Sequence, residues 1–429
     1  MGDAVDTVPM GAIHSSSAAG VDAEPVERWG MLAVLGVGLL LAMAPWFSSA
    51  AVAPVLRREW ATTGLELPLL SVAVQLGFAA GALALAAIGA PDVIPGPRLF
   101  AVGAALAAAA NLGFAAVASD PLSAIPFRAI TGAALAACYP VTLKLIAGWF
   151  RRERGLAIGV LIGALTVGSA LPYLFRAIGA YSGLDWRPIV ALASVAAMAG
   201  GVLVAVGGRP GPLDVAAPRF SPRIATDAFR QSSVRLANLG YLGHMWELYA
   251  MWTWVPVFLL ATFAAAGLAD AATASLAAFA VVGAGGVGCV VAGLLADRLG
   301  RTTTTIAAMA VSGSSAILSG LLFGAPPALV FAVGLVWGMS VVADSAQFSS
   351  AVSELAPPGT AGSALSVQVA AGFLLTGVTI LGIGLLSPDD AASWRAAWIV
   401  LAAGPAVGIV AMWRLRQHPD ALRMANGHR

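Results

Sequence analysis

Long apolar segments recur along the whole chain, and this pattern constrains the fold more than any other feature of the sequence. From Trp29 onward, apolar runs alternate with short charged or Pro/Gly-marked breaks. A run of roughly 20 apolar residues is long enough to cross the hydrocarbon core of a bilayer as a helix. Only 10% of the 429 residues are charged and the mean hydropathy is +0.88, whereas a soluble domain carries about 25% charged residues. The sequence therefore predicts an all-α polytopic membrane protein in contact with the lipid bilayer.

The apolar runs fit twelve transmembrane helices in two sets of six. A thin internal repeat supports the division, because Phe127 and Gly155 recur 204 positions later as Phe331 and Gly359. We therefore predict two pseudo-symmetric six-helix bundles. The predicted spans lie near 30–56, 66–90, 97–118, 121–149, 155–180 and 187–207, then near 235–264, 271–296, 303–323, 326–355, 360–386 and 394–414.

The regions between and beyond the spans complete the predicted domain organisation. Residues 1–28 are small and polar and lack the basic start of a cleaved signal peptide, so we expect a disordered tail. The predicted units that follow are an N-terminal bundle (29–207), a polar cytoplasmic central loop rich in Pro and Arg (208–233), a C-terminal bundle (234–416) and a short cytoplasmic tail (417–429).

The distribution of basic residues predicts the orientation, because Lys and Arg collect in cytoplasmic loops. With a cytoplasmic N-terminus and twelve spans, most basic residues outside the spans lie on the cytoplasmic side. Only Arg57, Arg58, Arg187 and Arg395 lie on the outer side. We therefore expect a multi-pass protein of the cell inner (plasma) membrane with both termini in the cytoplasm.

A short motif between the predicted eighth and ninth spans resembles a known signature. The segment from Gly293 to Arg301 reads Gly-Leu-Leu-Ala-Asp-Arg-Leu-Gly-Arg, and it is similar to the G-x-x-x-D-R-x-G-R loop of the major facilitator superfamily. The resemblance implies secondary transport by alternating access. It also implies a cytoplasmic gate in which Asp297 faces a neighbouring helix start and the basic side chains pair with carboxylates or lipid. The gate residues would be Gly293, Asp297, Arg298, Gly300 and Arg301.

Other segments resemble that superfamily less evenly. Gly148 to Gly159, with its Arg-Arg-Glu-Arg-Gly run, is similar to the loop after the fourth span, especially in anion and organic-acid carriers. The corresponding loop of the first half, Gly81 to Asp92, lacks the Asp-Arg pair, which makes a symmetric latch doubtful. Gly168 to Pro172 does not match the Gly-Pro pattern of drug exporters, which argues against a multidrug exporter.

Ionisable residues inside spans are the main candidates for function, since a charge at the bilayer centre is expensive. Only Glu247 and Asp344 among the acidic residues fall well inside predicted spans. His244 lies three residues before Glu247, so both side chains share a helix face and could share a proton. Asp344 and Gln347 share a face of the tenth span and form a polar stripe. We predict proton coupling through these acids and His244; a purely structural polar pair or salt bridge is the alternative.

Basic and aromatic side chains suggest the substrate. Arg128 and Lys144 lie within or at the edge of the fourth span and either face the cavity, where they would attract an anion, or reach outward to the surface. Trp246 and Tyr249 suit a wall of an organic-substrate cavity, although plain packing is as good an explanation. The predicted substrate-binding set is Arg128, Lys144, Tyr139, Trp246, Tyr249 and Gln347.

The same sequence argues against several other functions. A net charge of +2 is too small to favour nucleic acid. Cys138 and Cys289 stand apart from any CxxC pattern or His ligand, so we expect neither a metal site nor a disulfide. We expect no cofactor, because no P-loop motif is visible, and no enzyme activity, because no nucleophile–base pair occurs.

These observations predict a monomeric secondary transporter that moves a small organic or inorganic anion, by proton-coupled symport or a related mode. The runner-up is a proton-driven exporter of amphipathic or cationic compounds that uses the aromatic seventh span. A non-transporting membrane sensor is the remaining alternative, but the tails and central loop are too short to fold as an output domain.

Overall fold

The computed structural model describes residues 25–151, 153–213, 229–357, 359–386 and 388–428. All regular structure in these ranges is helical, which confirms the predicted fold class. Most of the predicted N-terminal tail (1–24) and much of the predicted central loop (214–228) lie outside the described residues.

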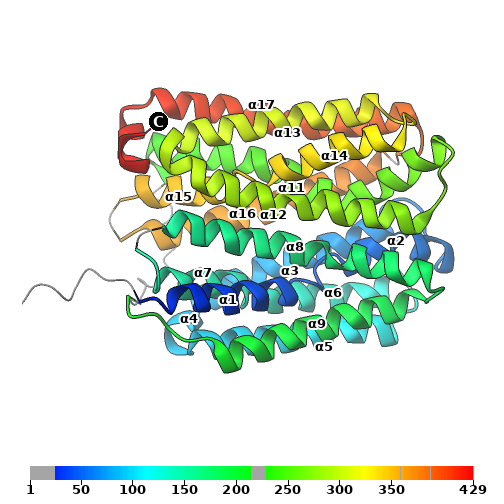
Figure 1. Cartoon of the computed structure of the whole chain (residues 1–429), viewed down its shortest axis with the longest axis horizontal. Coiled ribbons are helices and arrows are strands. Elements are labelled where there is room, and N and C mark those ends of the chain that lie inside the picture. Colours follow the sequence, from blue (N-terminus) through cyan, green and yellow to red (C-terminus); the bar gives the residue numbers. More distant parts are fainter. Residues whose placement is uncertain (1–24, 152, 214–228, 358, 387, 429) are drawn as a thin grey trace, which may run out of the picture.

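Among the described residues, eleven helical segments are long and apolar enough to cross a membrane. In the predicted first span, α1 is a shorter apolar helix, and α2 follows it after a break. Figure 1 shows the helices running side by side along the long axis. The elements of the first half are α1 (Arg28–Ala42), α2 (Ser48–Glu59), α3 (Glu66–Ala87), α4 (Ala90–Val93), α5 (Gly96–Val117), α6 (Pro121–Leu135), α7 (Tyr139–Ala147), α8 (Arg154–Tyr181) and α9 (Trp186–Gly207). Those of the second half are α11 (Ser232–Ala265), α12 (Ala271–Leu299), α13 (Arg301–Leu321), α14 (Pro327–Val341), α15 (Ser345–Leu355), α16 (Ala361–Leu385) and α17 (Ala391–Gln417).

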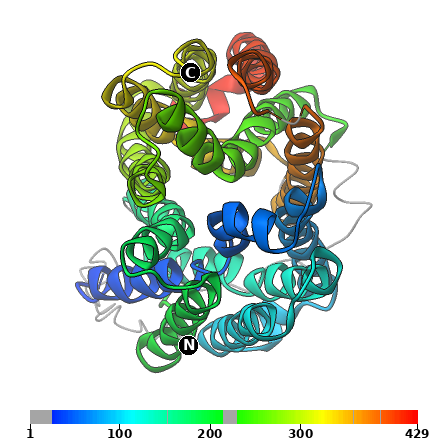
Figure 2. The ribbon, with the colours of Figure 1, turned by 90° about the vertical axis from the view of Figure 1, so that its right-hand side faces the viewer.

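The start of α1 and the end of the chain lie at the same end of the molecule, which we call the terminal end (Figure 1). Two short 3₁₀ helices, Pro419–Arg423 and Ala425–Gly427, follow α17 there. Viewed from the other, opposite end, the helices form two groups, and α2 lies near the middle between them (Figure 2). Segments from both halves therefore meet along the centre of the molecule.

The fourth and tenth spans are both broken, at similar places along their length. Cys138 lies between α6 and α7, and Asp344 lies between α14 and α15. Discontinuous helices expose backbone groups that can bind ligands or ions near the middle of a membrane. The break places Asp344 at the N-cap of α15 rather than inside one continuous helix, as the sequence had suggested.

Aspartates begin several helices at the opposite end. Asp120 and Asp390 each form a capping box with the serine three residues later, at the starts of α6 and α17. Asp270 accepts hydrogen bonds from the backbone of α12, and Asp185 accepts one at the start of α9. A side-chain oxygen at this position satisfies N–H groups that the first helical turn leaves free.

Small residues allow α12 and α14 to touch backbone to backbone. A Cβ atom built on Gly338 would lie 1.7 Å from the Val281 carbonyl oxygen, and one on Gly288 would lie 1.9 Å from the Met339 oxygen. No side chain fits at either position. The outer part of the tenth span is thus fixed to its neighbour, as small residues allow in membrane helices.

Candidate functional site: a buried acidic pair beside an aromatic layer

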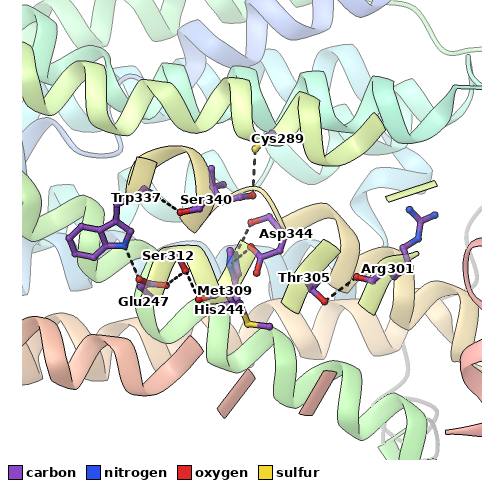
Figure 3. Close-up of polar contacts among 12 residues, drawn as sticks. His244, Glu247, Cys289, Arg301, Thr305, Met309, Ser312, Trp337, Ser340 and Asp344 are labelled. Carbon is purple, nitrogen blue, oxygen red and sulfur yellow. Dashed lines mark hydrogen bonds and ion pairs between the residues drawn. The ribbon is translucent and has the colours of Figure 1, made fainter. Parts of the chain in front are cut away.

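Glu247 is held inside the second half by neutral hydrogen-bond donors. It lies near the middle of α11 and is 2% exposed. Ser312 Oγ on α13 donates to one carboxylate oxygen at 2.8 Å, and Trp337 Nε1 on α14 donates to the other at 2.7 Å (Figure 3). No Lys or Arg among the described residues forms an ion pair with Glu247. The group therefore sits where a negative charge has hydrogen bonds but no countercharge.

His244 contacts the other buried acid. Its Nδ1 lies 2.9 Å from Asp344 Oδ1, and its Nε2 lies 2.7 Å from Ser345 Oγ. The predicted direct pairing of His244 with Glu247 was therefore wrong: the break before α15 carries Asp344 into the reach of the ring (Figure 3). Helix spacing placed His244 and Glu247 on one face, but tertiary contacts gave each a different partner.

Arg128 neither faces a cavity nor reaches the surface, so both sequence alternatives were wrong. Its side chain is fully buried in the first half. The guanidinium donates to the carbonyl oxygens of Pro45 and Trp46, at 3.0 and 2.6 Å, and to Ser48 Oγ and Asn111 Oδ1. These acceptors surround the break between α1 and α2, where helix carbonyls lose their usual partners. Arg128 thus stabilises the break.

The side chain of Lys144 is also bound to other groups of the protein. Its Nζ lies 2.6 Å from Asp92 Oδ1 and 2.7 Å from the Pro91 carbonyl oxygen. This contact joins α7 to the loop between the second and third spans at the terminal end. The first half thus has an ion pair where the sequence lacked the expected Asp-Arg motif, with the acid on the loop and the cation on the span.

The motif in the second half has the reverse arrangement. Arg301 donates to Asp297, Gln347 and Glu354, at 3.1, 2.8 and 3.0 Å. The start of α13 therefore carries the cation, and α15 carries the acid. Gln347, which we predicted to bind substrate, instead belongs to this cluster, because the polar stripe of α15 faces Arg301.

Asp297 lies beside the start of α8 in the first half. A Cβ atom on Gly155 would be 3.0 Å from Asp297 Oδ2, and one on Gly293 would be 3.0 Å from the Gly155 carbonyl oxygen. Gly300 has a φ of +91° between α12 and α13, a conformation that favours glycine. Arg298 is exposed. The motif therefore joins the two halves at the terminal end through Asp297.

The predicted aromatic residues separate in the structure. Trp246 donates from Nε1 to the Val400 carbonyl oxygen of α17, at 3.0 Å, and it lines a small pocket beside α17 rather than the cavity between the two halves. Tyr249 points to the first half and stacks against Trp46 and Phe47, with centroids 5.8 and 6.2 Å away. Tyr139 is half-buried at the start of α7.

Tyr249 belongs to an aromatic layer that the sequence did not reveal. Rings from α3, α11, α16 and the break after α1 meet there: Trp46, Phe47, Phe78, Tyr249, Trp252 and Phe373. Tyr173 on α8 donates to the Trp252 carbonyl oxygen at 2.8 Å. The layer therefore packs both halves together at the level of Glu247, on the other side of α11.

A cavity of about 360 Å³ lies between this layer and the opposite end of the molecule. It is lined by α2 and α3 of the first half and by α11 of the second, with Arg57 and Asp389 at its rim. Ser71 and Thr253 line it with mainly apolar neighbours. Both cysteines are free and buried, and the described residues contain no cluster that could hold a metal ion.

Ser312 and Trp337 donate to Glu247, but the sequence analysis does not predict either of them as a site residue. Trp337 lies seven residues before Asp344, a spacing that returns to one helix face, and this relation was the available signal. Nothing in the residues around Ser312 distinguishes it from the other serines of α13.

Comparisons with known proteins agree with this architecture. The family model of the Major Facilitator Superfamily matches residues 35–380. The structure is similar to that of a D-xylose-proton symporter, with a TM-score of 0.72 and 16% identity over 92% of this chain and 99% of that one. The xylose transporter XylE of E. coli gives 0.68 and 14%, over 90% and 99%, and a point mutant of the nucleoside transporter NupG gives 0.67 and 16%, over 90% and 99%.

Among curated proteins, the MFS-type transporter pytF of Aspergillus terreus is 27% identical over 180 residues. The match spans 40% of this chain and about half, 55%, of the length of that relative.

Proposed function

The chain belongs to the Major Facilitator Superfamily, and from this premise we propose that it is a secondary transporter that moves a small molecule by alternating access. Two groups of six helices, joined by contacts along one central layer, can rock between an arrangement open at one end and an arrangement open at the other. The cavity between α2, α3 and α11 supports access from the opposite end. We further propose the orientation predicted above, with the terminal end in the cytoplasm, the inner membrane as the location and a monomer as the working unit.

We propose that transport is coupled to protons through Glu247. The observation that carries this proposal is a carboxyl group that is 2% exposed, in a membrane-spanning helix, with two neutral donors and no cation partner among the described residues. A proton would remove the cost of that buried charge. We include His244 and Asp344 in the proposed coupling, because they form a second pair of ionisable side chains in the same half.

Protonation can drive transport only by favouring one arrangement of the halves over another. α11 is suited to this role because it carries Glu247 on the face toward α13 and α14 and Tyr249 on the face toward the first half. A change in the hydrogen bonds of Glu247 therefore acts on the same helix that closes the aromatic layer.

The contacts of Arg128 and Lys144 do not favour the predicted anionic substrate. An anion needs a fixed cation in the cavity, and the two candidates are occupied: Arg128 by backbone and amide oxygens and Lys144 by Asp92. The aromatic layer instead favours a substrate with an apolar or flat face, as in the alternative of an amphipathic compound. Similar folds that carry D-xylose or nucleosides, by their descriptions, are compatible with an uncharged cargo.

Uptake into proteoliposomes under an imposed pH gradient tests the proposal, with a mixture of radiolabelled nucleosides, sugars and organic acids as cargo. We expect the wild type to accumulate at least one class against its gradient. Glu247→Gln should abolish accumulation but keep downhill exchange, since the amide preserves the shape and hydrogen bonding of the group. If Glu247→Gln and Asp344→Asn both accumulate cargo as the wild type does, proton coupling through these residues is wrong.

A further inference from the structure

Three buried polar side chains in and beside the aromatic layer have no hydrogen-bond partner within the described part of the chain. They are Gln75, with both amide atoms unpaired, and Trp46 and Trp252, each with an unpaired indole N–H. Gln75 and Trp252 are 0% exposed and Trp46 is 2% exposed. Buried polar groups are almost always paired, so each exception requires an explanation.

These groups lie close in sequence to residues that line the cavity, on the side of those residues away from the opposite end. Ser71 lines the cavity and Gln75 follows it by four residues on the same face of α3, which runs inward from the opposite end. Thr253 lines it as well, and Trp252 precedes Thr253 on α11, which runs outward. Ala50 lines it from α2, and Trp46 lies four residues before Ala50. Three separate elements therefore bring their unpaired groups to one level.

The layer also supplies flat apolar surfaces next to these groups. Trp46 lies 4.9 Å from Phe78 and 5.8 Å from Tyr249, measured between ring centroids, and Phe78 shares a helix face with Gln75. No charged side chain donates to or accepts from these rings among the contacts of the described residues. An amide supplies both donors and an acceptor, and an indole supplies a donor.

We propose that this layer is the substrate site and that it takes an uncharged ring compound bearing several hydrogen-bonding groups, of the sugar or nucleoside kind. When the two halves part at this layer, the ring takes the place of one aromatic partner and stacks on Trp46 or Tyr249. Gln75 bonds to its hydroxyl or amide groups, and the two indoles donate to its oxygen acceptors. The proposal rests on the transport function proposed above and specifies its substrate class. A site built from paired donors and acceptors rejects ligands that leave those groups unmet.

The first test measures the thermal stability of the purified protein without ligand. Gln75→Leu is compared with Asn111→Leu, a matched buried amide whose atoms bond to Ser48, Arg128, Val190 and Ser194. If the Gln75 amide serves a ligand, its loss leaves the thermal melting temperature of the purified protein unchanged or higher. Asn111→Leu must lower it. A fall for Gln75→Leu equal to that for Asn111→Leu overturns the proposal.

The second test measures binding by quenching of tryptophan fluorescence in the full chain. The probes are uridine, adenosine, D-xylose and D-glucose as neutral compounds, benzoate as an anion and tetraphenylphosphonium as a cation. We expect a neutral probe to bind, and Gln75→Leu, Trp46→Phe and Trp252→Phe to weaken it by about tenfold or more. Trp246→Phe, which removes an indole already paired with Val400, should change affinity less than about twofold.

Binding of only the charged probes, or of no neutral probe, overturns this assignment of substrate class. The same samples separate it from the proposed function, because pH-driven uptake of benzoate would keep the transporter assignment and reject the neutral substrate. The opposite result is also possible: no gradient-driven uptake, while a neutral probe still binds and Gln75→Leu weakens that binding. It would reject the transporter assignment and keep the neutral ligand class.

Discussion

His244 Nδ1 lies 2.9 Å from Asp344 Oδ1, and both side chains are 2% exposed. The contact joins the middle of α11 to the break before α15. Removing one partner of a buried pair leaves the other uncompensated, which typically costs about 3 kcal/mol or more. We therefore expect Asp344→Ala to lower the free energy of unfolding by about that amount.

A double-mutant cycle checks this value. His244→Ala and Asp344→Ala should be strongly non-additive in denaturation from mixed micelles, because the second change removes a group already without its partner. Additive effects would mean that the two side chains do not depend on each other. Asp344→Asn should be milder, since the amide keeps the size of the side chain and a polar oxygen beside the ring.

Arg128 is predicted to be a structural residue of the first half. Replacing it with Met leaves the carbonyl oxygens of Pro45 and Trp46 without their donors, at about 1–3 kcal/mol for each buried group. Arg128→Lys should recover little, because one ammonium cannot reproduce the planar fork. Thermal unfolding measures both variants. A melting temperature of Arg128→Met within about a degree of wild type would contradict this role, given the several degrees that 1 kcal/mol normally produces.

The Asp92–Lys144 pair is predicted to matter for conformation more than for stability. Its side chains are 28% and 27% exposed, and ion pairs with such access to solvent contribute about 1 kcal/mol or less. Asp92→Lys and Lys144→Asp should each reduce transport rate with little change in melting temperature. The double variant, with the charges exchanged, should restore the rate. If it stays as slow as the single variants, the pair is not a closing contact.

The aspartate caps at the opposite end predict an acid limit to stability. Hydrogen bonds from Ser123 and Ser393 hold the pKa values of Asp120 and Asp390 below their ordinary 3.8. A depressed pKa contributes stability above the ordinary value, and that contribution is lost as the pH falls through the folded pKa. Asp120→Asn and Asp390→Asn should keep much of the cap and flatten the loss of melting temperature as the pH falls below about 4. Equal acid sensitivity in wild type and variants would contradict the assignment.

Much of the architecture could be predicted from the sequence, because hydropathy is set by the residues themselves. The span pattern holds in the helices observed, and Phe127 and Phe331, which the repeat relates, lie in α6 and α14, the first parts of the two broken spans. The break at Asp344 could not be predicted, since no proline or glycine marks it and the surrounding run stays apolar. It arises where tertiary contacts satisfy the freed backbone.

The candidate site was predicted less well for a similar reason. The burial of Glu247 follows from its place in an apolar run, but its partners Ser312 and Trp337 come from two other helices. The sequence offers a cavity or the surface for Arg128, because its sequence neighbours do not show the carbonyls of the α1–α2 break. The spacing of residues along one helix predicts which side chains share a face. It does not predict which distant helix packs against that face.

Finally, α15 connects two regions with different tasks. Asp344 stands at its first turn, and Gln347 and Glu354 both accept from Arg301 along its length. α14, by contrast, is clamped to α12 at Gly338. The short segment can therefore act as a lever with its pivot at the break. A change in the contacts of Asp344 at the break would pass along α15 to Gln347 and Glu354, and so to Arg301 at the start of α13, without disturbing the clamped part of the span.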